Sequence, residues 1–155
     1  MPVFIYKMRI RPAISADIPV LMALEKCAVT ASHWSAEQYQ AVFSNPGISR
    51  IALVIEQESR VEGFLIARAV RPEWEIENLA VAGPARRRGH GTRLLGEFLD
   101  MARNQGAEAV FLEVRESNLA ARRLYEKWAF VESGVRRRYY HDPLEDAVAY
   151  RFTFS

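Results

Sequence analysis

The sequence is poor in cysteine and has no long apolar segment. Its single cysteine among 155 residues, Cys27, excludes an internal disulfide and any metal site built from several cysteines. One thiol is also typical of a protein in a reducing compartment. Cys27 falls in a stretch that we expect to be helical, which predicts a buried structural thiol. No apolar run approaches the ~20 residues of a membrane span.

The first residues also lack the pattern of a secretory leader, because no long apolar region is followed by a small-residue cleavage site. The net charge of +2 does not indicate a nucleic-acid partner. We therefore expect a cytoplasmic protein that acts without membrane or nucleic acid, as a monomer or a homodimer. Since there is no repeat, linker or low-complexity tract, we expect one domain over residues 1–155.

Hydrophobic periodicity and turn residues predict alternating strands and helices. In chain order we expect a strand at 6–11, helices at 15–29 and 35–45, strands at 48–56, 61–70 and 74–81, a helix between Gly91 and Gly106, a strand at 109–114, a helix at 117–128, and strands at 130–139 and 147–154. Ser15 or Asp17 is expected to cap the first helix, and Ser35 the second. This order predicts a single α/β domain with a mixed sheet and helices on its faces.

The most informative stretch runs from Leu79 to Gly106, where a strand leads through a Gly- and Arg-rich turn into an amphipathic helix. Gly89 and Gly91 let the turn bend sharply and approach a ligand. A helix N-terminus presents unpaired N–H groups and a positive dipole end, which favours a phosphate. The Gly-Lys-Ser/Thr of a P-loop is absent, and Leu94 stands where a dinucleotide fingerprint has its third glycine.

What remains is the pattern Arg86-x-x-Gly89-x-Gly91, which resembles the acetyl-CoA pyrophosphate loop of the GNAT acetyltransferase superfamily. The segment LEVRESNLAARRLYEKWAF, from Leu112 to Phe130, is similar to the signature of the branch that acetylates the N-terminal alanine of a ribosomal protein. The resemblance covers essentially the whole chain. It implies the single-domain GNAT fold, an α/β structure with a mixed, mostly antiparallel sheet flanked by helices on both faces.

The resemblance also implies roles for individual residues in direct acetyl transfer from acetyl-CoA, without a metal. Glu113 matches the general base, and Tyr125 matches the acid that protonates the departing sulfur. The implied coenzyme contacts are the backbone of Leu79, Ala80 and Val81 with Asn118 for the pantetheine arm, and Arg86, Arg87, Arg88, Gly89, His90, Gly91 and Thr92 for the pyrophosphate.

Each of these residues also has a structural interpretation. Glu113 could be a salt-bridged surface residue, Tyr125 a core residue, and Asn118 only a helix cap. His90, at the variable position of the turn, is expected to be exposed rather than catalytic. Glu77 is a reserve base that could instead lie on a solvated strand face.

Protonation chemistry favours an N-terminal amine as the acceptor, because only a neutral amine can attack a thioester. An α-amine of pKa ~8 is roughly one-tenth neutral at pH 7, whereas a lysine of pKa ~10.4 is neutral in roughly one part in 2,500. The difference corresponds to ~3 kcal/mol of barrier, so one carboxylate serves the α-amine more easily. A protein or peptide N-terminus, with a ribosomal protein as first guess, is therefore the expected partner.

Segments that match the peptide side of the branch depart from its pattern. His33-Trp34-Ser35 resembles an aromatic-Pro-Trp-Ser segment, but His33 replaces the proline. Arg137 to Tyr140 resembles an Arg-Arg-x-Tyr-Tyr element, and the following His141 to Ala147 is shorter than usual. Two other hypotheses stay open: acetylation of a small amine or antibiotic, and a non-catalytic CoA- or RNA-binding module that uses the arginines at 86–88 and 136–138.

Overall fold

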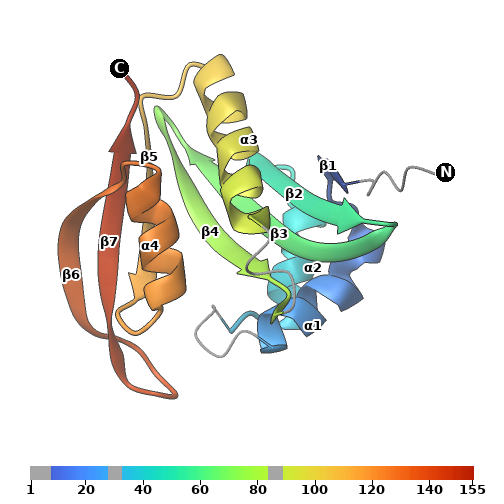
Figure 1. Cartoon of the computed structure of the whole chain (residues 1–155), viewed down its shortest axis with the longest axis horizontal. Coiled ribbons are helices and arrows are strands. Elements are labelled where there is room, and N and C mark those ends of the chain that lie inside the picture. The colour runs from blue at the N-terminus through green and yellow to red at the C-terminus, as the bar shows by residue number, and fades with distance from the viewer. Residues whose placement is uncertain (1–7, 28–32, 84–88) are drawn as a thin grey trace, which may run out of the picture.

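The computed structural model describes residues 8–27, 33–83 and 89–155. They form one seven-stranded sheet in the order β1-β2-β3-β4-β5-β7-β6 (Figure 1). The elements are β1 (Met8–Pro12), α1 (Ile18–Cys27), α2 (Ala36–Ser44), β2 (Arg50–Gln57), β3 (Arg60–Val70), β4 (Glu73–Val81), α3 (His90–Asn104), β5 (Ala109–Arg115), α4 (Leu119–Lys127), β6 (Val131–Tyr140) and β7 (Glu145–Thr153). The predicted order of elements is confirmed.

Neighbouring strands are antiparallel except β4 and β5, which run parallel with α3 as their connection. Helices cover both faces of the sheet, with α3 and α4 on the face toward the viewer in Figure 1 and α1 and α2 behind it. The buried stripe of α3, which includes Leu94, Leu95 and Phe98, packs in one core cluster. Leu21 and Tyr39 of α1 and α2 pack in a second cluster on the other face. The predicted fold class is confirmed.

The centre of the sheet is opened by a bulge in β4. Ile66 of β3 pairs with Asn78, and Ala67 pairs with Ile76, so Glu77 is an extra residue on β4. Ile76 therefore packs in the cluster beneath α3, whereas Ala80, four residues later, packs in the cluster beneath α1 and α2. The β4–β5 ladder ends at the pair Glu75–Phe111. Beyond Glu75, β4 and β5 separate and leave a split in the sheet.

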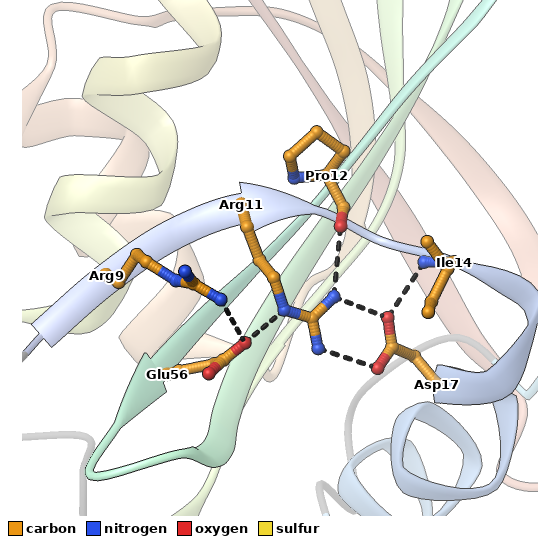
Figure 2. A network of polar contacts seen from close by, with 6 residues as sticks. All are labelled: Arg9, Arg11, Pro12, Ile14, Asp17 and Glu56. Carbon is orange, nitrogen blue, oxygen red and sulfur yellow. Dashed lines mark hydrogen bonds and ion pairs between the residues drawn. The ribbon is translucent and has the colours of Figure 1, made fainter.

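Arg11 links the edge strand β1 to its neighbours (Figure 2). Its two terminal nitrogens donate to the two carboxylate oxygens of Asp17, each at 2.9 Å, and its Nε donates to Glu56 on β2. Asp17 also accepts the backbone N–H of Ile14 at 2.8 Å. The Asp17 carboxylate therefore binds Arg11 and Ile14 in the turn that leads into α1.

Two predictions about the first helices had different outcomes. Ser35 caps α2 as expected, because its Oγ accepts the N–H of Gln38 at 3.2 Å. The buried-thiol prediction was wrong, since Cys27 is exposed. It lies at the last residue of α1, beyond Leu24 and Glu25, which are the last residues of the helix to be buried against the sheet. Among the described residues, no helix is long and apolar enough to cross a membrane.

Candidate active site

Two hollows meet at the split between β4 and β5. The narrow hollow lies in the split itself, lined by residues 76–79 of β4, residues 112–115 of β5, Asn118, Ala121, Tyr125 and Tyr140. The larger hollow is lined by His33, Trp34, Gln38, Arg68, Glu75, Ile76, Glu77, Glu113, Arg115, Tyr139, Tyr140 and His141. Glu113 and Tyr125, the two predicted catalytic residues, share the narrow hollow, and Glu113 also lines the larger one.

The strand alternation places Glu113 and Tyr125 on different faces of the sheet. Leu112 and Val114 pack in the core cluster beneath α3 and α4, to which Tyr125 also belongs. Side chains alternate along a strand, so Glu113 points to the opposite face. A molecule held in the split would therefore meet the carboxylate from one side of the sheet and the phenol from the other.

Glu113 is a partly buried carboxylate in which one oxygen forms an ion pair and the other forms none with the described residues. Its side chain is 19% exposed, and Oε1 forms an ion pair with Arg136 Nε at 3.2 Å. Oε2 is buried and has no hydrogen-bond partner among the described residues. Burial raises the pKa of Glu113 above its usual value; Arg136 opposes this shift and Glu75 adds to it. The higher pKa makes Glu113 a stronger base than an ordinary glutamate.

Tyr125 belongs both to the core and to the hollow. It is 4% exposed, and its ring centroid lies 5.5 Å from that of Phe130 and 6.1 Å from that of Tyr150. Burial raises the pKa of Tyr125 well above its usual value near 10, with Tyr140 adding to the shift. The phenol therefore keeps its proton at neutral pH, as a proton donor must.

Glu77 is less suited to act as a base. Its carboxylate accepts two hydrogen bonds from Arg50, with Nε at 2.8 Å and Nη2 at 3.4 Å. The two side chains are only 13% and 11% exposed, so the solvated-face interpretation of Glu77 was wrong. Because both carboxylate oxygens of Glu77 are engaged by Arg50, they are less available to a substrate amine.

The predicted diphosphate turn has the backbone that its glycines suggest. Gly89 lies in the left-handed region at φ 78° as the N-cap of α3, and the first helical bond runs from Arg93 N–H to Gly89 C=O. The N–H groups that precede this ladder, from Gly89 to Thr92, are the donors that a helix start leaves for a ligand. The three predicted arginines, 86–88, lie outside the described residues.

His90 departs from its prediction, because its side chain is fully buried. Nε2 lies 2.8 Å from Glu62 Oε2 on β3, while Nδ1 is buried without a partner among the described residues. The carboxylate of Glu62 makes burial of a polar ring acceptable at this position. His90 can therefore contribute its backbone N–H, but not its side chain, to a ligand bound at the start of the helix.

The residues predicted to hold the pantetheine arm lie beside the split. Leu79 lines the narrow hollow, while Ala80 and Val81 complete β4 beyond the end of its ladder with β5. Asn118 caps α4 by accepting Ala121 N–H at 3.1 Å, so its structural interpretation is confirmed. Asn118 also lines the narrow hollow, which keeps its coenzyme contact as a prediction.

A buried polar network, which the sequence pattern did not reveal, anchors one wall of the larger hollow. Glu25 accepts the backbone N–H of Trp34 at 2.9 Å and the Nδ2 of Asn78 at 3.2 Å. Asn78 also donates to the hydroxyl of Tyr39 at 3.1 Å. The segment that carries His33 and Trp34 is thereby tied to β4, one residue from Glu77.

Arg115 anchors the opposite wall. It is 3% exposed, donates to the carbonyls of Pro143 at 3.0 Å and His141 at 3.1 Å, and pairs with Glu145 at 3.4 Å. Its guanidinium carbon lies 4.5 Å from the ring centroid of Tyr140. The short segment between β6 and β7 is therefore held against the hollow by one buried cation. Among the described residues, no group of His, Cys, Asp or Glu side chains is placed to hold a metal ion.

Comparison with known sequences assigns a family. The sequence model of the acetyltransferase (GNAT) family matches residues 20–130. A ribosomal protein bS18-alanine N-acetyltransferase of Salmonella typhimurium is 35% identical over 126 residues, covering 81% of this chain and 82% of that protein. The Escherichia coli K12 enzyme of the same name is 34% identical over 136 residues, with coverage of 86% and 89%.

Solved structures agree with this assignment. The ribosomal-protein-S18-alanine N-acetyltransferase from Escherichia coli superposes with a TM-score of 0.84 at 29% identity, covering 96% of this chain and 95% of that one. Ard1 from Thermoplasma volcanium superposes with a TM-score of 0.86 at 26% identity, with coverage of 96% and 98%.

Proposed function

Because the chain belongs to the GNAT family of acetyltransferases, we propose that it transfers acetyl from acetyl-CoA to the N-terminal α-amine of a protein, with a ribosomal protein as the first candidate. The names of the relatives support this choice of acceptor. The observation that carries the proposal is the position of Glu113, which lines both the narrow hollow in the split and the larger hollow beside it.

The narrow hollow and the turn before α3 suit a thioester carried on a long phosphorylated arm. Acetyl-CoA supplies the activated acetyl group. The backbone of Leu79 to Val81 would align the arm, and the N–H groups of Gly89 to Thr92 would receive the diphosphate, assisted by the arginines at 86–88. The left-handed Gly89 fits this role, because a Cβ built there would meet no atom of the described residues within 4 Å, so those residues do not crowd an approaching anion.

Glu113 removes the proton from the incoming ammonium, directly or through one water. Its raised pKa brings it closer to the α-amine, whose pKa is ~8, so the proton transfer is less uphill than to an ordinary glutamate. Tyr125 serves the departing sulfur from the other side of the sheet. Since burial raises the pKa of Tyr125, full proton transfer to a thiolate is strongly uphill, and a hydrogen bond to sulfur is its main contribution.

A panel of acceptors tests the choice of substrate. The purified chain with acetyl-CoA is offered a short peptide that starts with alanine, the same peptide with a blocked N-terminus and an internal lysine, a polyamine and an aminoglycoside. We expect acetylation of the free peptide and little of the blocked one, because lysine is far less often neutral. Preference for a polyamine or aminoglycoside over every peptide would contradict the proposal. Mass spectrometry of cellular protein N-termini, with and without this protein, identifies the natural acceptor.

Two variants test the assigned roles. Glu113→Gln and Tyr125→Phe are each expected to lower kcat roughly 100-fold or more, as for loss of a general base and of a hydrogen-bond donor to the departing sulfur, while the Kd of acetyl-CoA stays nearly unchanged. Wild-type activity in both variants would rule out these roles.

A further inference from the structure

Arg136 on the edge strand β6 reaches across β7 to Glu113. Glu113 on β5 is paired in the ladder with Ala149 of β7, and Ala149 is paired with Gly134 of β6. Arg136 itself is opposite Ala147. The residues of β7 that lie between Arg136 and Glu113, Ala147 and Ala149, have small side chains. The guanidinium can therefore extend across the surface of β7 to Glu113.

The contact between Arg136 and Glu113 is asymmetric. Arg136 Nε binds Oε1 at 3.2 Å, and the arginine side chain is 64% exposed, so most of it faces solvent. Oε2, in contrast, is buried and has no partner among the described residues. The arginine occupies one oxygen of the carboxylate and leaves the inner one available.

We propose that Arg136 is a positioning residue for Glu113, which holds the outer carboxylate oxygen so that the inner oxygen, in its ionised form, receives the proton of the amine. This inference rests on the proposed function of Glu113 as the base. Arg136 favours the ionised form because it is a positive charge beside a carboxylate whose burial favours the neutral form. Without it, Glu113 is protonated, and therefore inactive as a base, up to a higher pH.

Other charged and titratable side chains around Glu113 also influence its titration. Glu75 and Glu77 face it from β4, Arg115 from its own strand, and Tyr140 from the end of β6. His33 and His141 also line the larger hollow. Because these groups are the same in every Arg136 variant, a comparison between variants isolates the contribution of Arg136.

The experiment combines a direct titration with a pH–rate profile. The side-chain carboxyl carbon of Glu113 is followed by ¹³C NMR in the free protein, with its signal assigned by its loss in Glu113→Gln. In Arg136→Gln we expect the titration midpoint to move to higher pH, and in Arg136→Lys we expect most of that change to be reversed. We expect kcat/KM of Arg136→Gln to fall most at acidic pH, by no more than about fivefold, and to approach the wild-type value as the pH rises, the size typical of one exposed ion pair.

Arg103→Gln is the matched control, because Arg103 is 67% exposed, pairs with Asp100 at 3.6 Å and lies at the far end of α3. It should change neither the titration nor the profile. An unchanged Glu113 midpoint in Arg136→Gln, or a fall in kcat/KM that is equal at all pH values, would overturn the inference. A shifted midpoint together with full activity of Glu113→Gln would instead overturn the role of Glu113 as base, on which the inference rests.

Discussion

The ring of His90 at the first turn of α3 and the carboxylate of Glu62 on β3 form a contact of 2.8 Å between Nε2 and Oε2. His90 is fully buried, and the side chain of Glu62 is 15% exposed. The pair ties the start of the helix to the sheet at the proposed diphosphate site. The backbone of Glu62 also accepts the N–H of Ala82, just beyond β4, at 2.7 Å. Glu62 therefore holds both ends of the turn that connects β4 to α3.

Removal of the carboxylate should destabilise the protein. In Glu62→Ala the buried imidazole loses its partner, and we expect a cost of about 1–3 kcal/mol in the free energy of unfolding. The double variant Glu62→Ala/His90→Leu should recover part of this loss, because neither polar group then remains buried alone. Urea denaturation of the single and double variants measures the coupling. Strictly additive effects would argue against the pair.

Because of the Arg11–Asp17 contact, the free energy of unfolding should decrease at acidic pH. The hydrogen bonds from Arg11, opposed by burial, hold the pKa of Asp17 below its usual value. A lowered pKa in the folded state means that the stabilisation is present above the unfolded pKa of ~3.9 and is lost as pH falls through the folded pKa. Asp17→Asn should therefore cost about 1.5–3 kcal/mol at pH 7.

The difference in Tm between Asp17→Asn and wild type should shrink as the pH is lowered below about 4. Asp100→Asn serves as the control, since Asp100 is 69% exposed and pairs only at 3.6 Å with Arg103. If the Tm difference for Asp17→Asn is the same at pH 3 as at pH 7, the carboxylate is not the stabilising species.

Glu25 should have the opposite pH dependence. Burial raises its pKa, against the hydrogen bonds from Trp34, Tyr39 and Asn78. The folded state therefore binds the proton more tightly than the unfolded state. The contribution of this pKa shift to the free energy of unfolding is fully present below the unfolded pKa of ~4.3. It is lost as pH rises through the folded pKa.

Glu25→Gln keeps an oxygen acceptor but removes the charge. We expect its Tm relative to wild type to rise between pH 4 and pH 7, because only wild type pays the cost of a buried charge. Glu37→Gln, at an exposed position in the first turn of α2, should show no such trend. A constant Tm difference across this pH range would contradict the prediction.

Two glycines should be required for different reasons. Gly89 has φ 78°, where an alanine costs about 1–2 kcal/mol even though its Cβ would meet no atom of the described residues within 4 Å. A Cβ at Gly96 would lie 3.0 Å from two ring atoms of Trp128, which predicts a cost of about 1–3 kcal/mol from overpacking. Only Gly89→Ala should also weaken acetyl-CoA binding, measured by calorimetry. Gly83→Ala is the control, because a Cβ there would meet no atom of the described residues within 4 Å and its φ is not in the left-handed region.

The sequence alone was sufficient to predict the order of strands and helices and the family. It also placed Glu113 on a strand, Tyr125 on a helix, and a glycine turn at the start of α3. These features depend on local patterns: hydrophobic period, capping residues such as Ser35, and a glycine turn that ends in a helix. The parallel pairing of the strand after α3 also followed from the order of the elements.

Only the tertiary structure decided which polar groups share a neighbourhood. The burial of His90 against Glu62, the ion pairs of Glu77 with Arg50 and of Glu113 with Arg136, and the exposure of Cys27 all differ from or extend the sequence predictions. Each depends on the bulge in β4, on ladder register, or on where a helix ends against the sheet. These are contacts between distant parts of the chain, and a local pattern of residues does not contain them.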